Sequence, residues 1–255
     1  MTYCLGLLLD DGLVMMADTR TNAGVDNFST YRKLHTLADT SERQIYACTS
    51  GSLSISQTAL AMLAEGLQGA DDHAPRRTLA TVPTMFQAAT LVGEIVTAIR
   101  HDLRAALSAE GVSTTVSMLL GGRIGDGPPK LYHIYTAGNF IECKPESPFL
   151  QIGETKYGKP ILDRALAVDT PLADAVKTAF LSFDSAIRSN LGVARPIDVL
   201  VMPTDPAAPL INRRVDEDDP YFNDLSARWH EALRTARLAI PNPPWMEGDG
   251  LEPHP

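Results

Sequence analysis

The residue whose type and position could do chemistry stands near the start of the chain. Thr2 follows the initiator Met1, and a second residue this small permits removal of the methionine. Removal would expose a threonine that carries both a hydroxyl and a free α-amine. A hydroxyl is a weak nucleophile unless a base lies beside it, and an α-amine with an ordinary pKa of about 7.7–8.0 can be that base. Threonine is common at position 2, however, so Thr2 alone carries no functional information.

Other catalytic and binding motifs are missing from the sequence. It has no GxxxxGK[ST], no HExxH and no paired CxxC, and its glycine cluster at 121–127 does not match GxGxxG. The six histidines include no i, i+4 pair, which argues against a histidine-ligated metal and a Ser-His-Asp triad. We therefore expect no metal and no cofactor. Because the chain lacks a nucleotide-binding motif, any ATPase that feeds it would be a separate partner.

Composition and charge are those of a globular protein that does not bind nucleic acid. Of the 255 residues, 44% are hydrophobic and 21% are charged, as in ordinary globular proteins. The net charge of −9 argues against nucleic-acid binding, because an acidic surface repels phosphates. The basic pairs Arg76-Arg77 and Arg213-Arg214 are isolated.

The sequence also indicates a compartment. No apolar run approaches the ~20 residues that span a bilayer, so we expect no membrane association. The N-terminus lacks the basic start and apolar core of a secretory signal. Three cysteines, an odd number set in apolar stretches, are typical of buried free thiols in a reducing compartment. We expect a cytoplasmic protein.

Hydrophobic patterning predicts the elements that would position Thr2. Tyr3–Leu9 is nearly all apolar, as in a strand buried on both faces. The turn signal Asp10-Asp11-Gly12 and a returning strand at Leu13–Asp18 complete a hairpin. A further strand is expected at Gln44–Ser50.

The order of the remaining elements predicts the fold class. A helical pair over about 52–107 is followed by several strands, a second helical pair over 158–188 and a last strand at 197–202. This order lacks the βαβ alternation of a Rossmann fold or TIM barrel. It favours an α+β fold, a four-layer αββα sandwich in which two sheets pack together between outer layers of helices. After Pro203 the chain becomes acidic and proline-rich, with one helix expected at about 220–238.

Four short blocks near the N-terminus form a recognisable pattern. They are Thr2-Tyr3-Cys4, the stretch from Leu8 to Val14, the stretch from Asp18 to Asp26, and Tyr31-Arg32-Lys33. Together they resemble the proteasome β-subunit and HslV family of threonine proteases, and most closely its bacterial branch Anbu, the ancestral β subunit. The resemblance implies the N-terminal-nucleophile hydrolase fold. It divides the chain into a β-subunit-like hydrolase domain over 1–203 and a C-terminal extension over 204–255.

The resemblance implies four central roles. Thr2 would be the nucleophile and its α-amine the proton acceptor. Lys33 would lower the pKa of both groups through its positive charge, and Asp18 would pair with Lys33. Gly51 matches the glycine whose backbone N–H faces the oxyanion of the tetrahedral intermediate.

Supporting and substrate-binding roles follow from the same resemblance. Arg20 would hold the loop behind Asp18. Thr21, Thr49 and Leu53 would line the pocket for the residue before the scissile bond. These side chains suggest a moderately small pocket of mixed polarity.

The second half of the chain departs from the family pattern. Proteasome β subunits have a Gly-Ser-Gly-Ser element where this chain reads Gly153-Glu154-Thr155-Lys156. We expect Ser189 to replace the serine that contacts the Thr2 amine, with Asp184 or Ser185 supporting it. This change puts the tuning of the amine in question.

The resulting hypothesis is peptide-bond hydrolysis through an acyl-enzyme on Thr2. The subunits would form a ring or spiral homo-oligomer, and the substrate would be a peptide or an unfolded protein. Two alternatives stay open. The altered segments at 153–156 and 184–189 favour a scaffold or binding assembly with little turnover. A small-amide hydrolase is the other, because related N-terminal-nucleophile enzymes act on small amides.

Overall fold

The N-terminal hairpin is the centre of the first sheet. In the computed structural model, β1 (Tyr3–Leu9) pairs with β2 (Gly12–Asp18) in antiparallel register, with Cys4 opposite Ala17. The predicted strand and turn are therefore confirmed. This sheet has the order β10-β1-β2-β11-β12. Its other strands are β10 (Phe149–Gly153), β11 (Ile197–Pro203) and β12 (Ile211–Val215).

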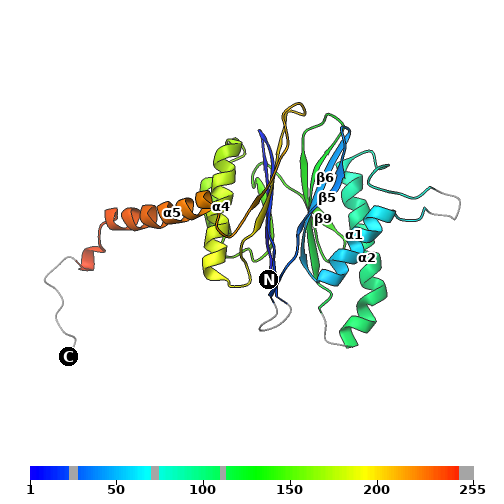
Figure 1. Cartoon of the computed structure of the whole chain (residues 1–255), viewed down its shortest axis with the longest axis horizontal. Helices are drawn as coiled ribbons and strands as arrows, with labels where there is room; N and C mark the ends of the chain where they lie inside the picture. The colour runs from blue at the N-terminus through cyan, green and yellow to red at the C-terminus, as the bar shows by residue number, and fades with distance from the viewer. Residues whose placement is uncertain (23–27, 70–74, 110–112, 247–255) are drawn as a thin grey trace. The chain divides into compact units, whose positions relative to one another are not determined.

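A second antiparallel sheet of five strands lies against the first (Figure 1). Its strands, in their order across the sheet, are β5 (Leu34–Asp39), β6 (Arg43–Gly51), β7 (Val116–Ile124), β8 (Lys130–Ile134) and β9 (Phe140–Glu142). A short ribbon of β3 (Arg20–Asn22) and β4 (Phe28–Thr30) follows β2. Leu13, Met15 and Leu119 lie in the core between the two sheets.

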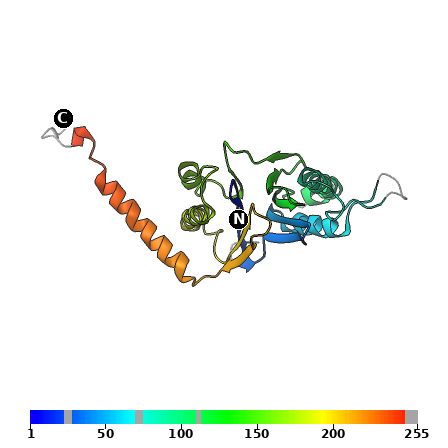
Figure 2. The same ribbon diagram turned by 90° about the horizontal axis from the view of Figure 1, so that it is seen from above.

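Helices cover the outer face of each sheet, as Figures 1 and 2 show. The second sheet carries α1 (Leu53–Glu65) and α2 (Met85–Ala109), and the first carries α3 (Lys159–Ala165) and α4 (Leu172–Ser189). Buried residues of α2 recur every three or four positions and pack on the second sheet. On the other side, the rings of Tyr3 in β1 and Phe183 in α4 lie 4.6 Å apart. The predicted αββα sandwich is confirmed.

The structure describes the chain apart from residues 23–27, 70–74, 110–112 and 247–255, and apart from the side chains of 22, 28 and 104–108. Residues 23–26 of the predicted family motif thus lie outside the described residues. The chain forms two compact units, Met1–Glu217 and Asp218–Pro255. Within the described parts of the chain, no helix combines the length and apolarity that a membrane crossing requires.

The first unit continues beyond residue 203, where the composition changes, because β12 pairs with β11. Sequence patterning did not predict β12, since four of its five residues are exposed and no alternation marks it as a strand. The assignment of a hydrolase domain to 1–203 stays a prediction. The second unit contains α5 (Pro220–Ala239), which begins where Asp219 accepts a hydrogen bond from the Phe222 amide at 2.8 Å, and η1 (Pro244–Met246).

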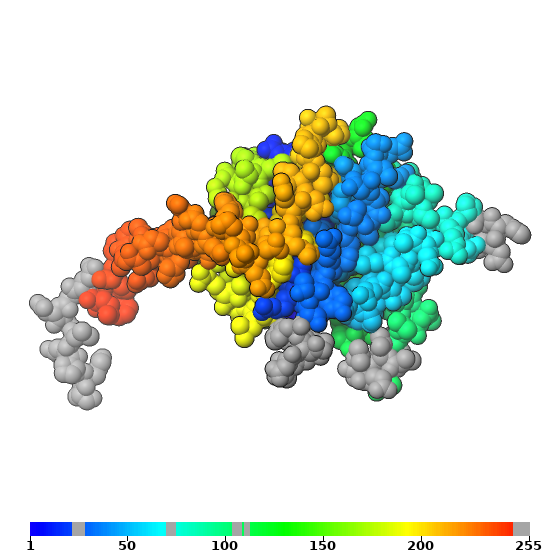
Figure 3. Space-filling view, in the orientation of Figure 1, coloured from blue at the N-terminus to red at the C-terminus, as the bar shows by residue number. Residues whose placement is uncertain are grey.

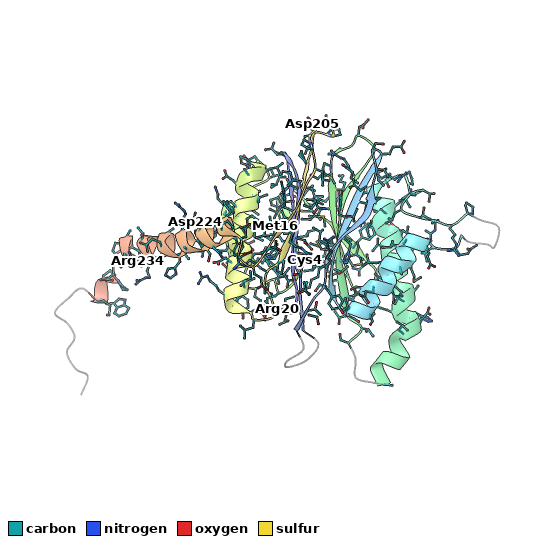
Figure 4. The ribbon with its side chains drawn as sticks, in the orientation of Figure 1. Cys4, Met16, Arg20, Asp205, Asp224 and Arg234 are labelled. Carbon is teal, nitrogen blue, oxygen red and sulfur yellow. The ribbon has the colours of Figure 1, made fainter. Side chains whose placement is uncertain are left out.

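The three cysteines Cys4, Cys48 and Cys143 are free and buried, as their apolar surroundings in the sequence predict. Figure 4 shows Cys4 between the two sheets. Burial, together with its neighbour Cys48, holds the pKa of the Cys4 thiol well above its ordinary value. Cys4 is therefore a packing residue rather than a nucleophile.

Candidate active site

The β1–β2 hairpin places Asp18 directly beside the N-terminus. Asp18 is the last residue of β2 and is fully buried, and its Oδ1 accepts the backbone N–H of Tyr3 at 2.9 Å. The following residue, Thr19, donates its hydroxyl to the Pro196 carbonyl at 2.9 Å, which ties the end of β2 to the loop before β11. The hydrogen bonds from Tyr3 and to Pro196 thus fix the end of β2, and with it Asp18, beside the N-terminus.

Lys33 reaches the same point from the second sheet. Its carbonyl accepts the Thr49 amide at 2.9 Å, which docks the residue on β6 just before β5 begins. The side chain is only 6% exposed, and its Nζ lies 2.7 Å from Asp18 Oδ1. Nζ also donates to the carbonyls of Arg20 at 2.5 Å and Met1 at 3.3 Å. The ammonium therefore bridges the two sheets beside the chain terminus.

Burial and charge act on the titrating groups at this point. Burial raises the pKa of Asp18, while Lys33 and the backbone amides of Tyr3 and Ala194 oppose that rise. The pKa of the Met1 α-amine is lowered, first by burial and then by the Lys33 charge, with Asp18 acting in the opposite direction. An amine near Lys33 is thus more easily kept in its neutral, basic form.

A cavity of about 330 Å³ opens beside these groups. Thr2, Lys33 and Gly51 all line it, so the structure brings together the predicted nucleophile, cation and oxyanion-binding glycine. The cavity is also lined by the three predicted substrate-binding residues, Thr21, Thr49 and Leu53. Ser50, Ser56 and Gly153 line it as well. The volume is near the lower end for ligand pockets, and the hydroxyl-rich lining gives it mixed polarity.

Two glycines let the backbone approach the cavity closely. Gly51 has φ of +98°, and a Cβ there would lie 2.2 Å from the Thr115 carbonyl oxygen. Gly153 has φ of +85°, and a Cβ there would lie 2.0 Å from the Thr2 carbonyl oxygen. Neither site accommodates a side chain, because both the conformation and the space exclude one.

Arg20 lies at the end of the sandwich where the chain begins (Figure 4). Its Nη1 donates to the Leu191 carbonyl at 3.0 Å, and its own carbonyl accepts from Lys33. Arg20 therefore connects β3, the Lys33 ammonium and the loop after α4. This contact is compatible with the predicted role of holding the loop behind Asp18.

The three residues predicted on α4 are not among those that line the cavity. Ser189 is exposed at the end of the helix. Asp184 pairs along the helix with Arg188 at 3.0 Å, and Ser185 donates back to the Leu181 carbonyl at 3.1 Å. Asp184 and Ser185 thus make these hydrogen bonds to residues one turn away within α4 itself. The predicted roles of all three residues beside the Thr2 amine stay predictions.

Glu154 contacts Thr2 instead and is hydrogen-bonded to Asn190, and the sequence offered no reason to assign either residue a role. The Glu154 amide donates to the Thr2 carbonyl at 2.6 Å. The buried Glu154 carboxylate accepts from Asn190 Nδ2 at 2.9 Å, and Asn190 Oδ1 accepts the Gly192 amide at 2.9 Å. The signal that could have found Glu154 was the carboxylate in a segment where the family has small hydroxyl residues.

No group of three or more histidine, cysteine, aspartate or glutamate side chains gathers as a metal site within the described residues. Among the groups that line the cavity are the Thr2 hydroxyl, the terminal α-amine and the Lys33 ammonium. Their arrangement suits nucleophilic attack on a carbonyl carbon, with the amine taking the proton.

Comparison with protein-family models and with curated proteins gives no match. Solved structures do match. A Gly-1 mutant of Anbu from Hyphomicrobium sp. strain MC1 is 41% identical with a TM-score of 0.84, over 95% of this chain and 99% of that one. Anbu (ancestral beta-subunit) from Yersinia bercovieri is 38% identical with a TM-score of 0.84, over 94% and 98%. Anbu in a helical assembly from Pseudomonas aeruginosa is 41% identical with a TM-score of 0.85, over 96% and 100%. The chain therefore belongs to the Anbu family of proteasome-type ancestral β subunits.

Proposed function

We propose that this chain is a threonine-type peptidase subunit, which hydrolyses peptide bonds through an acyl-enzyme on Thr2 after Met1 is removed. The observation that carries the proposal is the buried ion pair between Lys33 and Asp18, whose ammonium lines the same cavity as Thr2. Burying charges is costly unless they are paired, and charged groups in such surroundings cluster at functional sites.

The position of Met1 supports the role of the Thr2 amine. The nitrogen that becomes this amine is bonded to the Met1 carbonyl carbon, and the Met1 oxygen lies 3.3 Å from Lys33 Nζ. The nitrogen is two bonds from that oxygen, so it lies within roughly 6 Å of the ammonium, a distance over which a charge shifts a pKa. Removing Met1 would therefore create an amine whose pKa Lys33 lowers.

The reaction would proceed in two steps. The Thr2 hydroxyl attacks the scissile carbonyl while the amine takes its proton, and the backbone N–H of Gly51 stabilises the oxyanion. The amine returns the proton to the leaving nitrogen as the C–N bond breaks, which leaves an ester on Thr2. Water then attacks the ester, the amine again carries the proton, and the peptide acid departs with Thr2 restored.

Self-assembly is the second part of the proposal. The described part of the second unit exposes several large apolar side chains, namely Leu233, Leu238, Ile240, Trp245 and Met246. Exposed apolar surface of this kind marks protein–protein contacts, and the Pseudomonas relative forms a helical assembly. We propose a ring or helical homo-oligomer, which would restrict Thr2 to peptides and unfolded chains.

Sedimentation velocity tests the assembly. We expect the double substitution Leu238→Ser/Ile240→Ser to shift the chain toward smaller species. Leu191→Ser, which changes another exposed leucine in the first unit, should leave the distribution unchanged. An equal effect of both changes, or of neither, argues against an interface on the second unit.

One observation favours a second candidate function, a scaffold or binding assembly with little turnover. Glu154, whose backbone amide donates to the Thr2 carbonyl, carries a buried carboxylate at a position where relatives of the wider family have serine, and Ser189 is exposed. A nearby negative charge would raise the pKa of the Thr2 amine and oppose Lys33. This alternative predicts correct assembly without acylation.

Intact mass measured before and after incubation with a peptide epoxyketone tests the catalytic proposal. The warhead reacts with a hydroxyl and a free α-amine on the same residue. We expect loss of Met1 and a mass gain of one inhibitor, abolished by Thr2→Ala and retained by Thr58→Ala, which changes an exposed threonine of α1. Retention of Met1 would contradict the mechanism, and loss of Met1 without addition would favour the scaffold. Parallel assays on peptides and simple acyl amides would then separate peptidase from small-amide hydrolase.

A further inference from the structure

Met1, the residue whose removal would expose the Thr2 amine, lies against the loop that follows α4. The chain begins at the lower end of the sandwich, marked N in Figure 1, and Figure 3 shows the dark blue N-terminal segment there beside the yellow segment that contains the end of α4. A Cβ built on Gly192 would lie 2.5 Å from Met1 Cβ and 2.7 Å from Met1 Cγ. The first two side-chain carbons of Met1 therefore pack directly against the Gly192 backbone.

Hydrogen bonds hold this loop in place. Gly192 is buried and its amide donates to Asn190 Oδ1 at 2.9 Å, while Asn190 Nδ2 donates to the Glu154 carboxylate at 2.9 Å. Arg20 donates to the Leu191 carbonyl at 3.0 Å. The loop is thus connected to the segment after β10 and to β3. A surface fixed in this way can bind a ligand without the entropic cost of ordering the loop.

Met1 belongs to the same cavity as Thr2. Both residues line it, and Lys33 Nζ donates to the Met1 carbonyl at 3.3 Å. Met1 is 63% exposed, so most of its surface faces solvent while its first side-chain carbons contact the loop. Loss of Met1 would therefore leave a space between the Thr2 nitrogen and Gly192 that is open to the cavity.

The proposed reaction needs space at this position. In the acylation step the Thr2 amine gives a proton to the leaving nitrogen, so the two nitrogens must come within hydrogen-bond distance, roughly 2.7–3.2 Å. Met1 Cα is ~2.4 Å from the Thr2 nitrogen, because a single carbonyl carbon joins the two atoms. The space that Met1 occupies beside this nitrogen is thus close enough to receive the leaving nitrogen and the residue to which it belongs.

We propose that the loop over 190–192 binds the side chain of the first residue after the scissile bond, and that it favours an unbranched aliphatic side chain such as that of methionine. The inference rests on the proposed peptidase function. It assigns a subsite on the leaving side of the bond, whereas Thr21, Thr49 and Leu53 are predicted to bind the residue before it. Gly192 makes the subsite possible, because a side chain there would take the space that the first carbons of the ligand need.

Competition between two peptides in one reaction tests the subsite. The pair derives from any peptide that the mature chain cleaves, with methionine after the cleaved bond in one and glycine in the other. We expect kcat/KM to be about fourfold higher for the methionine peptide, as for burial of roughly one methylene group. In Gly192→Ala the ratio should fall to about one, because the added methyl group occupies the subsite. Alanine is compatible with the mature chain, since Gly192 has no positive φ and the nearest atom apart from Met1 would be Asn190 Oδ1 at 3.2 Å.

Amine acceptors provide a second measurement, which requires no variant. Methioninamide or glycinamide, added at a pH where both amines are neutral, competes with water for the acyl group on Thr2. The ester C–O bond breaks, the new amide C–N bond forms, and the proton of the acceptor nitrogen passes through the Thr2 amine to the Thr2 hydroxyl oxygen. At equal concentration, methioninamide should capture about fourfold more acyl product than glycinamide, for the same reason of methylene burial.

Gly127→Ala is the matched control, because the atom nearest to its Cβ would be 4.0 Å away. It should keep the fourfold ratio of the unchanged chain. A ratio near one in the unchanged chain, or the same ratio in Gly192→Ala, would overturn the subsite and leave the peptidase function standing. Equal loss of the ratio in both variants would overturn it as well. Absence of both epoxyketone labelling and peptide cleavage would instead overturn the peptidase function, and the subsite with it.

Discussion

The buried Asp18–Lys33 ion pair should contribute measurably to the stability of the chain. The substitution Asp18→Asn keeps the shape of the side chain but removes its charge. Asp18 is fully buried, and its Oδ1 lies 2.7 Å from Lys33 Nζ. In the variant, the buried ammonium would keep only neutral acceptors, which include the carbonyls of Arg20 and Met1. After removal of Met1, the second of these carbonyls is lost as well.

The expected loss of stability follows from burial. Breaking a buried pair by removing one partner typically costs ~3–5 kcal/mol, because the remaining charge is left uncompensated. The carbonyl acceptors of Lys33 place the expected value near the lower end, about 3 kcal/mol. For a chain of this size, that loss corresponds to a decrease in Tm of roughly 6–12 °C.

A matched control separates burial from ion pairing. Lys159 and Asp163 on α3 are also 2.7 Å apart, but their side chains are 54% and 47% exposed. We expect Asp163→Asn to lower the free energy of unfolding by only about 0.3–0.5 kcal/mol, as for other exposed ion pairs on helices. The two aspartates thus form ion pairs of equal length that differ in solvent exposure.

The assay is thermal and urea unfolding of each variant at one protein concentration, since oligomerisation makes apparent stability concentration-dependent. The double variant Asp18→Asn/Lys33→Met should be more stable than Asp18→Asn alone, because it leaves no unpaired buried charge. An Asp18→Asn variant that loses no more stability than Asp163→Asn would refute a role for burial. So would a double variant whose loss of stability equals the sum of the losses of Asp18→Asn and Lys33→Met.

Three further predictions concern the surroundings of Thr2. The mature chain should gain kcat/KM as pH rises, with a midpoint below the ordinary amine value of about 7.7–8.0. Burial and the Lys33 ammonium lower the pKa of the Met1 α-amine, and we expect them to act in the same direction on the Thr2 amine that replaces it. A midpoint above 8 in a pH profile would contradict this. Glu154→Ala and Asn190→Ala should each lower the free energy of unfolding in urea by about 1.5–3 kcal/mol, and each should slow epoxyketone labelling. Additive losses of stability in the double variant would show that the hydrogen bond between the two side chains does not act as a unit. Gly153→Ala should abolish labelling because its Cβ would lie 2.0 Å from the Thr2 carbonyl oxygen. The control Gly127→Ala should label normally, since the atom nearest to its Cβ would be 4.0 Å away. Equal labelling of both variants would refute the close approach.

Local patterning in the sequence was sufficient to predict the hairpin beside the site. A continuous apolar run and a glycine turn specify the strand Tyr3–Leu9 and the hairpin that places Asp18 next to Tyr3. The pairing of Lys33 with Asp18 was predicted from family resemblance, and the structure contains it. The composition change after residue 203 did not mark the end of the first unit, because β12 is held by pairing with β11 and has no pattern of its own.

The sequence by itself determined the order of the main strands and helical pairs, although not β12, and pointed to Thr2, because hydrophobic periodicity and the N-terminal motif are local properties. Only the tertiary structure decided which distant groups meet at that residue. Glu154 follows β10 and Asn190 follows α4, 36 positions apart in the sequence, and Ser189 is left exposed at the end of α4. The Lys33 ammonium likewise reaches Asp18 only because the two sheets, which contribute one residue each, pack against each other. Such contacts depend on how the sheets pack, and one-dimensional spacing carries no record of that packing.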